Sequence, residues 1–333
     1  MVATLQTVAA RLGLDPSTVS RAFNEPERVS LRTRRRIAEV AEELGYRPNS
    51  AARALVTGRT DTIGVVVPDV ANPVFPEFVK SAQAHAWGNG QAVLLAGTDE
   101  SPDREREIVK RLLRQVDGLV LCSSRLDQEE ITDLAAQTHL VLVNRRFPGV
   151  SAVLVDATDG VRQAMEHLVA LGHRRIVYAA GPERSWSDAE RRRLLAQQAE
   201  RLRIDLVVVG PFVPTHEGGA GAAEAVRATG ATAVVAYNDL MALGIQSALA
   251  VAGVAVPDDM SVMGVDDIST SAISTPALTT IRVSMGAAGE ASARLMAEVA
   301  SGAVADPTVV TLSTQLVVRA STGHAPSATS VTG

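Results

Sequence analysis

From Asp61 onward, short runs of apolar residues alternate with longer amphipathic segments, and this alternation limits the folds open to the chain. Strands that are apolar on both faces are typical of parallel sheets covered by helices on both sides. Nine such runs are Ile63–Val67, Ala92–Leu95, Gly118–Cys122, Leu140–Val143, Val153–Val155, Ile176–Ala179, Leu206–Val209, Ala233–Ala236 and Ser261–Val265. Their number predicts two α/β lobes, with a ligand site in the crevice at the carboxyl ends of the strands.

Length and composition agree with a globular protein of several domains. The 333 residues exceed one ordinary core and predict two or three domains. The apolar runs are too short to span a bilayer, and the N-terminus lacks a basic region followed by an apolar core, so neither a membrane span nor a secretory signal is expected. The one cysteine, Cys122, excludes an internal disulfide, predicts a reducing cytoplasm and is expected to be a buried structural thiol.

Charge is distributed unevenly along the chain. The net charge is −5, but residues 1–60 contain ten Arg and six acidic residues, which gives +4 for this head and −9 for the rest. A basic head on an acidic body indicates an end that binds nucleic acid. A solvated charged surface would give the same count, so charge alone does not decide between the two.

The first 47 residues predict three short helices. Thr4 can cap a helix that ends near Leu12, and Gly13 permits a sharp turn. Asp15 then caps a second helix with Pro16 at its first position, where the missing N–H costs nothing. Two short helices joined by a tight turn and braced by a third form a helix-turn-helix unit.

The remaining boundaries follow from the same signals. Ser30 caps the third helix, which is expected to end at Gly45. The predicted organisation is a helix-turn-helix domain over residues 1–48, a hinge linker over 49–60, a two-lobed ligand-binding and dimerisation domain over 61–322, and a flexible tail over 323–333.

The second helix carries the residues expected to read DNA. A recognition helix presents polar side chains near its N-terminus to the major groove, and an arginine there can pair with guanine O6 and N7. The candidates are Ser17, Thr18, Ser20, Arg21 and Asn24. Taken alone, these residues would also suit the solvated surface of a small helical domain.

Ordered motifs along nearly the whole chain resemble the lac-repressor family. In the head they are Thr4–Arg21, Arg28–Ser30, Ala41–Asn49 and Ala52–Leu55. Beyond it they are Val66–Phe75, Val116–Gly118, His167–Ile176, Asn238–Gly244, Gly264–Asp267, Thr275–Thr280 and Leu316–Arg319. The resemblance implies a transcription regulator, expected to be a repressor, with a periplasmic-binding-protein-like sensor. It also implies a homodimer on palindromic operator half-sites, controlled by a small-molecule effector.

The resemblance also implies roles for individual residues. Residues 50–57 would form a hinge helix on operator DNA, with Leu55 as an apolar wedge between base steps, although Leu55 would also suit a packing anchor. Around the crevice the resemblance points to Phe75, Arg145, Arg193, Phe212, Asn238 and Asp266. Trp186 joins them because it falls, with Phe75 and Phe212, on a predicted crevice loop, where aromatic faces suit a sugar or a purine.

The sequence departs from the family pattern at several positions. Thr7 replaces an acidic residue, and Pro16 occupies a position that often contacts DNA. Ala196-Gln197 replaces a glycine–aromatic pair after Arg193, which puts the placement of Arg193 in doubt. Val283-Ser284 replaces a Gln-Pro pair at the lobe crossover, and no leucine heptad follows Arg319.

Two other functions fit part of the sequence. A cytoplasmic sugar-binding protein without operator-specific DNA binding would share the lobes but leaves the basic head unexplained. A hydrolase could use Asp266-Asp267, but the sequence shows no ordered nucleophile, base and orienting residue, and His173 is expected to be a helix-end residue. We therefore expect no enzymatic activity, no cofactor and no metal, whereas the effector, the operator and the direction of the effector's action stay open.

Overall fold

A computed structural model describes residues 3–46, 58–304 and 306–326, and the chain divides into two compact units, Met1–Asp61 and Thr62–Gly333. The elements of the first unit are α1 (Leu5–Leu12), α2 (Pro16–Asn24), the 3-10 helix η1 (Pro26–Arg28) and α3 (Leu31–Glu43). Each α-helix begins where a capping residue is predicted, and the three pack around Val8, Val19 and Ile37. The predicted hinge helix over residues 50–57, including Leu55, lies outside the described residues.

The caps of the first unit explain one departure from the family pattern. Thr4 Oγ1 accepts from the Thr7 N–H, and the Thr4 N–H donates to Thr7 Oγ1 at 2.7 Å, so the Thr7 hydroxyl completes the capping box. Gly13 ends α1 at φ +64°, a conformation that favours glycine. Asp15 then accepts from the Ser17 N–H at 2.8 Å and begins α2.

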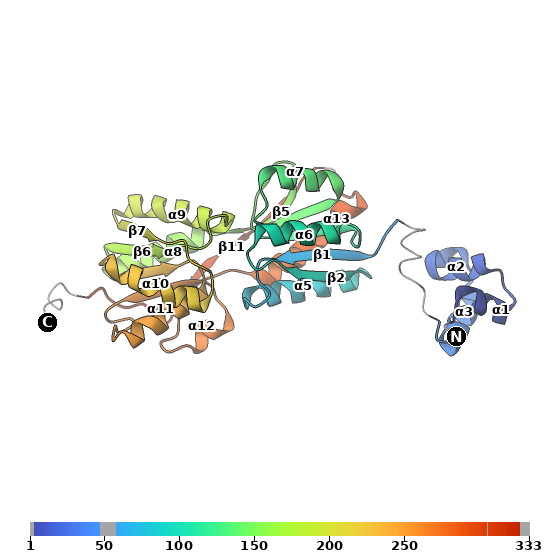
Figure 1. The fold of residues 1–333 in the computed structure, drawn as a ribbon, viewed down its shortest axis with the longest axis horizontal. Coiled ribbons are helices and arrows are strands. Elements are labelled where there is room, and N and C mark those ends of the chain that lie inside the picture. Colours follow the sequence, from blue (N-terminus) through green and yellow to red (C-terminus); the bar gives the residue numbers. More distant parts are fainter. Residues whose placement is uncertain (1–2, 47–57, 305, 327–333) are drawn as a thin grey trace. The chain divides into compact units, whose positions relative to one another are not determined.

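The second unit contains two six-stranded sheets covered by helices (Figure 1). The strands are β1 (Thr62–Val67), β2 (Ala92–Gly97), β3 (Gly118–Cys122), β4 (His139–Val143), β5 (Ser151–Asp156), β6 (Arg175–Ala179), β7 (Asp205–Val209), β8 (Ala233–Ala236), β9 (Ser261–Asp266), β10 (Thr279–Arg282), β11 (Val309–Ser313) and β12 (Gln315–Val317). The helices are α5 (Val74–Gly88), α6 (Pro102–Leu112), α7 (Gln128–Gln137), α8 (Thr158–Ala170), α9 (Trp186–Leu202), α10 (His216–Ala228), α11 (Asp239–Val251), α12 (Ser269–Ile273) and α13 (Met285–Ser301).

The two sheets confirm the predicted two-lobed α/β fold. The first lobe has strand order β11-β5-β4-β3-β1-β2 and is parallel throughout. The second has order β12-β10-β9-β8-β6-β7 and is parallel except for β12, which pairs antiparallel with β10. Each of the nine predicted runs lies in a strand, whereas β10, β11 and β12 were not predicted.

The chain crosses between the lobes three times. It leaves the first lobe after β5, returns from β10 into α13, and leaves again between β11 and β12. The first lobe is therefore completed by α13 and β11 from late in the sequence. Gly289 of α13 packs so closely on α5 that a Cβ atom there would lie 2.1 Å from the Phe78 carbonyl oxygen.

Four smaller observations complete the fold. His173 is fully buried rather than a simple helix-end residue: its Nδ1 lies 2.8 Å from Thr232 Oγ1 and its Nε2 3.1 Å from the Gly323 carbonyl oxygen. Residues 323–326, expected in a flexible tail, are tied to the second lobe, since Ala325 N–H donates to Leu171 O at 2.8 Å. Cys122 is buried, which raises the pKa of its thiol to about 12. Within the described ranges, no helix has the length and apolar character needed to cross a membrane.

Candidate functional site

A cavity with about 820 Å³ of empty space, part of it open to solvent, lies between the two lobes of the second unit. Its lining includes residues that directly follow parallel strands of both sheets: Pro68, Ser123, Asn144 and Tyr237 follow β1, β3, β4 and β8, and Asp266 ends β9. All three crossovers contribute as well, through Ala157, Val283 and Thr314. The cavity therefore occupies the crevice at the strand ends, where ligands bind in α/β folds, and is bounded by both lobes.

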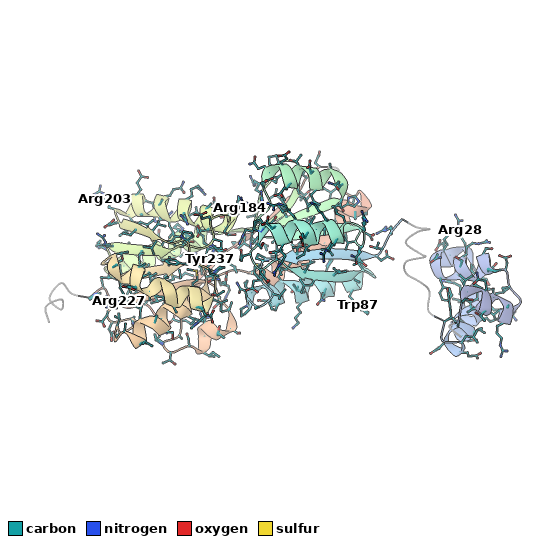
Figure 2. All side chains as sticks on the ribbon, in the orientation of Figure 1. Arg28, Trp87, Arg184, Arg203, Arg227 and Tyr237 are labelled. Carbon is teal, nitrogen blue, oxygen red and sulfur yellow. The ribbon has the colours of Figure 1, made fainter. Side chains whose placement is uncertain are left out.

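On the second-lobe wall, a carboxyl group and a guanidinium group lie close together. Asp266 ends β9 at φ +123°, a backbone conformation that non-glycine residues rarely adopt. Burial raises the pKa of its carboxyl group from 3.8 to about 8, an effect that Arg191 opposes and Asp239 reinforces. Arg191 Nη1 donates to the Tyr237 carbonyl oxygen at 2.7 Å, and its guanidinium lies 4.9 Å from the centre of the Tyr237 ring. Tyr237, labelled in Figure 2, thus holds Arg191 through its carbonyl oxygen and its ring.

Asn238 is fixed in the same wall by its role as a helix cap. Its Oδ1 accepts from the Met241 N–H at 2.9 Å, which begins α11, and its Nδ2 donates to the Pro214 carbonyl oxygen at 3.0 Å. The side chain is almost completely buried. One N–H of the amide is left for a ligand, in an orientation that the cap determines.

The adjacent carboxylates Asp266 and Asp267 have different surroundings. Asp267 forms ion pairs with Arg282 and Arg319, both at 2.5 Å. Asp266 lines the cavity and accepts no hydrogen bond from a side chain or N–H group of the described residues. The chain directly after them is held by buried Asp239, which accepts from the Ile268 N–H at 3.0 Å.

The first-lobe wall carries Phe75 at the start of α5, together with a second guanidinium–carboxylate pair, Arg125 and Glu100. Arg125 is almost completely buried and its Nε donates to Glu100 Oε2 at 2.9 Å. Arg125 also donates its backbone N–H to Glu105 at 2.8 Å. Burial raises the pKa of Glu105, while Ser124 and Arg125 oppose that shift.

Four of the seven predicted effector residues come together on this cavity: Phe75, Trp186, Asn238 and Asp266. Arg145, Arg193 and Phe212 are absent from its described lining. Arg145 turns instead to the carbonyl oxygens of Ser124 and Leu126, and Phe212 packs on the hydrophobic core of the second lobe. For these three residues the structure offers no direct contact with a ligand in the cavity.

The position of Arg193 follows from helical geometry. Two residues along an α-helix rotate the side chain by about 200°, so Arg191 and Arg193 point to nearly opposite sides of α9. Arg191 faces the cavity, and Arg193 is half exposed and pairs with Glu190. The structure thus places Arg191, and not the predicted Arg193, in the lining of the cavity, within a run of three arginines that gives no internal signal of which one faces inward.

Other lining residues were missed for different reasons. Arg125 and Ser123 follow β3 directly, and polar residues at the carboxyl end of a buried strand were the signal that would have found them. Tyr237 follows β8 in the same way. Glu100 lies beyond β2 in a turn with φ +60°, which no pattern in the sequence predicts.

On the first unit, α2 presents polar residues on its exposed side. Ser17 and Arg21 are exposed one turn apart, and Arg21 Nη2 donates to Ser17 Oγ at 2.8 Å. Thr18, Ser20 and Asn24 are half-buried, and Asn24 Nδ2 donates to Ser20 Oγ at 3.2 Å. Buried Val19 holds the opposite side of α2 against the core of the unit.

Comparisons with known proteins cover both units. Residues 4–49 match the family model "Bacterial regulatory proteins, lacI family", and residues 165–322 match "Periplasmic binding protein-like domain". The HTH-type transcriptional regulator GalS of Salmonella typhimurium is 36% identical over 307 residues, covering 90% of each chain.

Two solved structures are similar over nearly the whole chain. The lac repressor dimer bound to operator and the anti-inducer ONPF superimposes with a TM-score of 0.87 at 28% identity and covers 97% of this chain and 100% of that one. The complex of the transcriptional regulator CelR with cellobiose has a TM-score of 0.71 at 30% identity and covers 96% and 99%. By its matched domains and its identity to GalS, the chain belongs to the lacI family of bacterial regulatory proteins.

Proposed function

We propose that this chain, a DNA-binding transcription regulator, represses its target genes as a homodimer and is controlled by a sugar bound between its lobes. The observation that carries the proposal is the cavity whose walls come from both lobes and all three crossovers. A ligand that contacts both walls favours one arrangement of the lobes over others, and such differential binding is what couples an effector to a second site.

The cavity chemistry supports a sugar. Asp266, Arg191 and Asn238 offer a carboxyl group, a guanidinium group and an amide N–H, which suit ligand hydroxyl groups. Trp186 and Phe75 supply aromatic surface for the C–H face of a sugar ring. The similarity to the CelR–cellobiose complex supports the same class, and a purine is the alternative that the aromatic residues also suit.

For DNA, the exposed side of α2 supports the proposal. Ser17 and Arg21 would enter the major groove, with Arg21 pairing with guanine and paired heads reading two half-sites. The similarity to the operator-bound lac repressor dimer supports both the DNA partner and the dimer. With operator DNA as the partner, we place the protein in the cytoplasm.

We further propose that the chain is not an enzyme. Asp266 lines the described cavity, and the carboxylate next to it in the sequence, Asp267, is held by two arginines. Asp267 is therefore held in ion pairs and is not available as a catalytic partner of Asp266. The relatives named above are regulators, which supports this interpretation.

The proposal is tested by two measurements on the full chain. A binding selection on random DNA should yield a palindromic site, and Arg21→Ala should relax base preference at one position per half-site, at a cost of about 1–3 kcal/mol. Arg28→Ala, in η1 outside α2, is the matched control and should weaken binding to all sequences alike. No sequence preference for the wild-type protein would favour a sugar-binding protein without operator-specific binding.

The ligand is tested by a thermal-shift screen of sugars and nucleobases, because a ligand that binds only the native state raises the unfolding midpoint. A sugar that shifts the midpoint should also change the affinity for the selected DNA site. If only nucleobases shift the unfolding midpoint, the proposed ligand is a purine and not a sugar.

A further inference from the structure

We propose that Asp188, buried in the first turn of α9, fixes the rotation of this helix and thereby decides that Arg191, rather than a neighbouring arginine, faces the cavity. Asp188 is absent from the described lining, so it is a positioning residue that acts through Arg191 and Trp186. The inference rests on the proposed function, because it takes Arg191 and Trp186 as contacts of the ligand.

Asp188 occupies a position of α9 where an apolar residue would be expected. One helical turn after another from Asp188, the same side of the helix carries Arg192, Leu195 and Ala199. Leu195 and Ala199 are buried in the core of the second lobe, and Asp188 is only 2% exposed. A buried ion pair contributes little to stability but can select one arrangement among several, which is the role we assign to Asp188 and Arg192.

Three donors hold the Asp188 carboxylate. Its Oδ1 accepts from the Tyr178 hydroxyl group at 2.8 Å and from the Gly181 N–H at 2.7 Å, and its Oδ2 accepts from Arg192 Nε. Tyr178 belongs to β6 and Gly181 to the segment that follows this strand, so the carboxylate ties α9 to a second element. Rotation of α9 about its axis would break these hydrogen bonds and leave a buried charge unpaired.

Helical geometry carries this orientation to the arginines. Each residue advances the side chain by about 100° around the axis, so Arg191 lies about 60° from Asp188 and Arg193 about 140° away on the other side. With Asp188 turned to β6, Arg191 lines the cavity and Arg193 is half exposed. The apolar residues define this rotation poorly, because Leu194 and Leu195 are adjacent and both are buried.

A second set of contacts leads from Asp188 to Tyr237, the residue that holds Arg191. The Asp188 N–H donates to Ser185 Oγ at 3.2 Å, and Ser185 Oγ lies 3.0 Å from the Tyr237 hydroxyl oxygen. Gly181, which donates its N–H to Asp188, packs so closely on the Tyr237 ring that a Cβ atom there would lie 2.5 Å from a ring carbon. Loss of the Asp188 carboxylate should therefore disturb both Arg191 and Tyr237.

Trp186 reports on the same helical turn without a ligand. It is the first residue of α9, lines the cavity and packs against the hydrophobic cluster of the first lobe that contains Leu126. Trp186 lies about 160° from Asp188 around the helix, so turning Asp188 to the core of the second lobe directs Trp186 toward the first lobe. The exposure of Trp186 thus depends on the rotation that Asp188 fixes.

The first test measures this exposure in the ligand-free, full-length protein. In the parent variant Trp87→Phe, Trp186 is the only tryptophan, and acrylamide quenching follows its accessibility. Adding Asp188→Ala should raise the quenching constant by about twofold or more, because the first turn of α9 is no longer held. The matched control is Arg193→Gln, which breaks the ion pair with Glu190 on the same helix but lies outside the lining. Its quenching constant should equal that of the parent.

A neutral replacement of the ion pair distinguishes this contact from a general preference for an acidic residue near a helix N-terminus. In Asp188→Asn, the amide Nδ2 faces Arg192 Nε, so a donor meets a donor and the quenching constant should rise. In Asp188→Asn/Arg192→Gln, the two amides can form a hydrogen bond, and the quenching constant should return to that of the parent. Both changes nearly preserve side-chain size, so this test does not depend on the folding of Asp188→Ala.

The second test is affinity by calorimetry, with cellobiose and galactose as the probes. Asp188→Ala should lower the affinity for the tighter-binding probe by about tenfold or more, and Asp188→Asn/Arg192→Gln should restore it relative to Asp188→Asn. If Asp188 acts through Arg191, the double variant Asp188→Ala/Arg191→Ala should bind about as weakly as the weaker of its two single variants.

Three results would overturn the inference. These are a parent-like quenching constant in Asp188→Ala, no recovery in Asp188→Asn/Arg192→Gln, and affinity losses that multiply in Asp188→Ala/Arg191→Ala. Each of them leaves a sugar-controlled regulator intact. If no sugar in the thermal-shift screen binds the wild-type protein, the proposed function fails in its choice of ligand, whereas the quenching series still decides whether Asp188 fixes the rotation of α9.

Discussion

The raised pKa of Asp266 makes a prediction that can be worked out from the ligand-free protein. An unfolded chain ionises this carboxyl group near its ordinary pKa of 3.8, whereas the folded protein keeps the proton up to about pH 8. The folded state therefore binds one more proton than the unfolded state across that interval. The contribution of the protonated Asp266 carboxyl group to the free energy of unfolding is complete below pH 3.8 and is lost as the pH rises toward 8.

Asp266→Asn removes this titration and keeps the size of the side chain. Between pH 5 and 7 the free energy of unfolding of the wild type should fall, relative to the variant, by about 1.4 kcal/mol for each pH unit. Above pH 8 the difference should level off. The free energy of unfolding of the variant, relative to the wild type, is thus expected to increase as the pH rises, although the variant lacks the carboxyl group that a ligand would contact.

Urea unfolding at pH 5, 6, 7 and 8.5 measures the difference. Tryptophan fluorescence follows the sensor alone, because both tryptophans, Trp87 and Trp186, belong to the second unit. Asp267→Asn is the control for the loss of a neighbouring carboxyl group: it breaks ion pairs with Arg282 and Arg319 and should lower the free energy of unfolding. A constant difference between Asp266→Asn and the wild type would refute the reasoning, since it would mean that Asp266 is already ionised at pH 5.

Two further predictions concern packing and the choice of arginine. A Cβ at Gly244 would lie 2.0 Å from the His216 carbonyl oxygen, so Gly244→Ala should force α10 and α11 apart and lower the free energy of unfolding in urea by about 1–3 kcal/mol or more. Gly221 has open space around it, so Gly221→Ala should not destabilise the protein. Equal stability of the two variants would contradict the packing. Arg191→Ala should lower the affinity for the sugar found in the thermal-shift screen by at least tenfold, and Arg193→Ala should leave this affinity, measured by calorimetry, unchanged. A loss in Arg193→Ala and none in Arg191→Ala would restore the assignment made from the sequence.

How far the sequence predicts the fold depends on what the buried strands are made of. Gly118–Cys122 is apolar at every position and is recognised as a strand because both of its faces are covered. Thr279–Arg282 is also an interior strand of its sheet but carries buried threonines, and Thr280 Oγ1 donates to Asp239 at 2.5 Å. Because hydrogen bonds rather than apolar contacts satisfy these side chains, β10 does not stand out as an apolar run. β11, at the edge of its sheet, alternates between exposed and half-buried residues and is equally inconspicuous.

The residues of the site also divide into those that could be predicted from the sequence and those that could not. Asp266 and Asn238 were predicted from the resemblance to the family, and both lie near the ends of apolar strands, a position that the topology carries to the crevice. Arg191 was missed because three consecutive arginines differ only in helical phase, which depends on where α9 begins. Glu100 was missed because its place in the lining follows from a turn with positive φ, and neither apolar periodicity nor a glycine marks it.

The three crossovers have a consequence for how the protein is made. Synthesis runs from the N-terminus, so β1 to β5 leave the ribosome long before α13 and β11, which complete the first lobe. Until α13, which ends at Ser301, has emerged, the face of α5 that packs on it, including Phe78, has no covering helix. The second lobe lies between these segments and can assemble most of its sheet first. A nascent chain of this protein therefore carries an unfinished lobe at its leading end for most of its translation, and a premature stop before α13 would leave that apolar face open to chaperones and proteases.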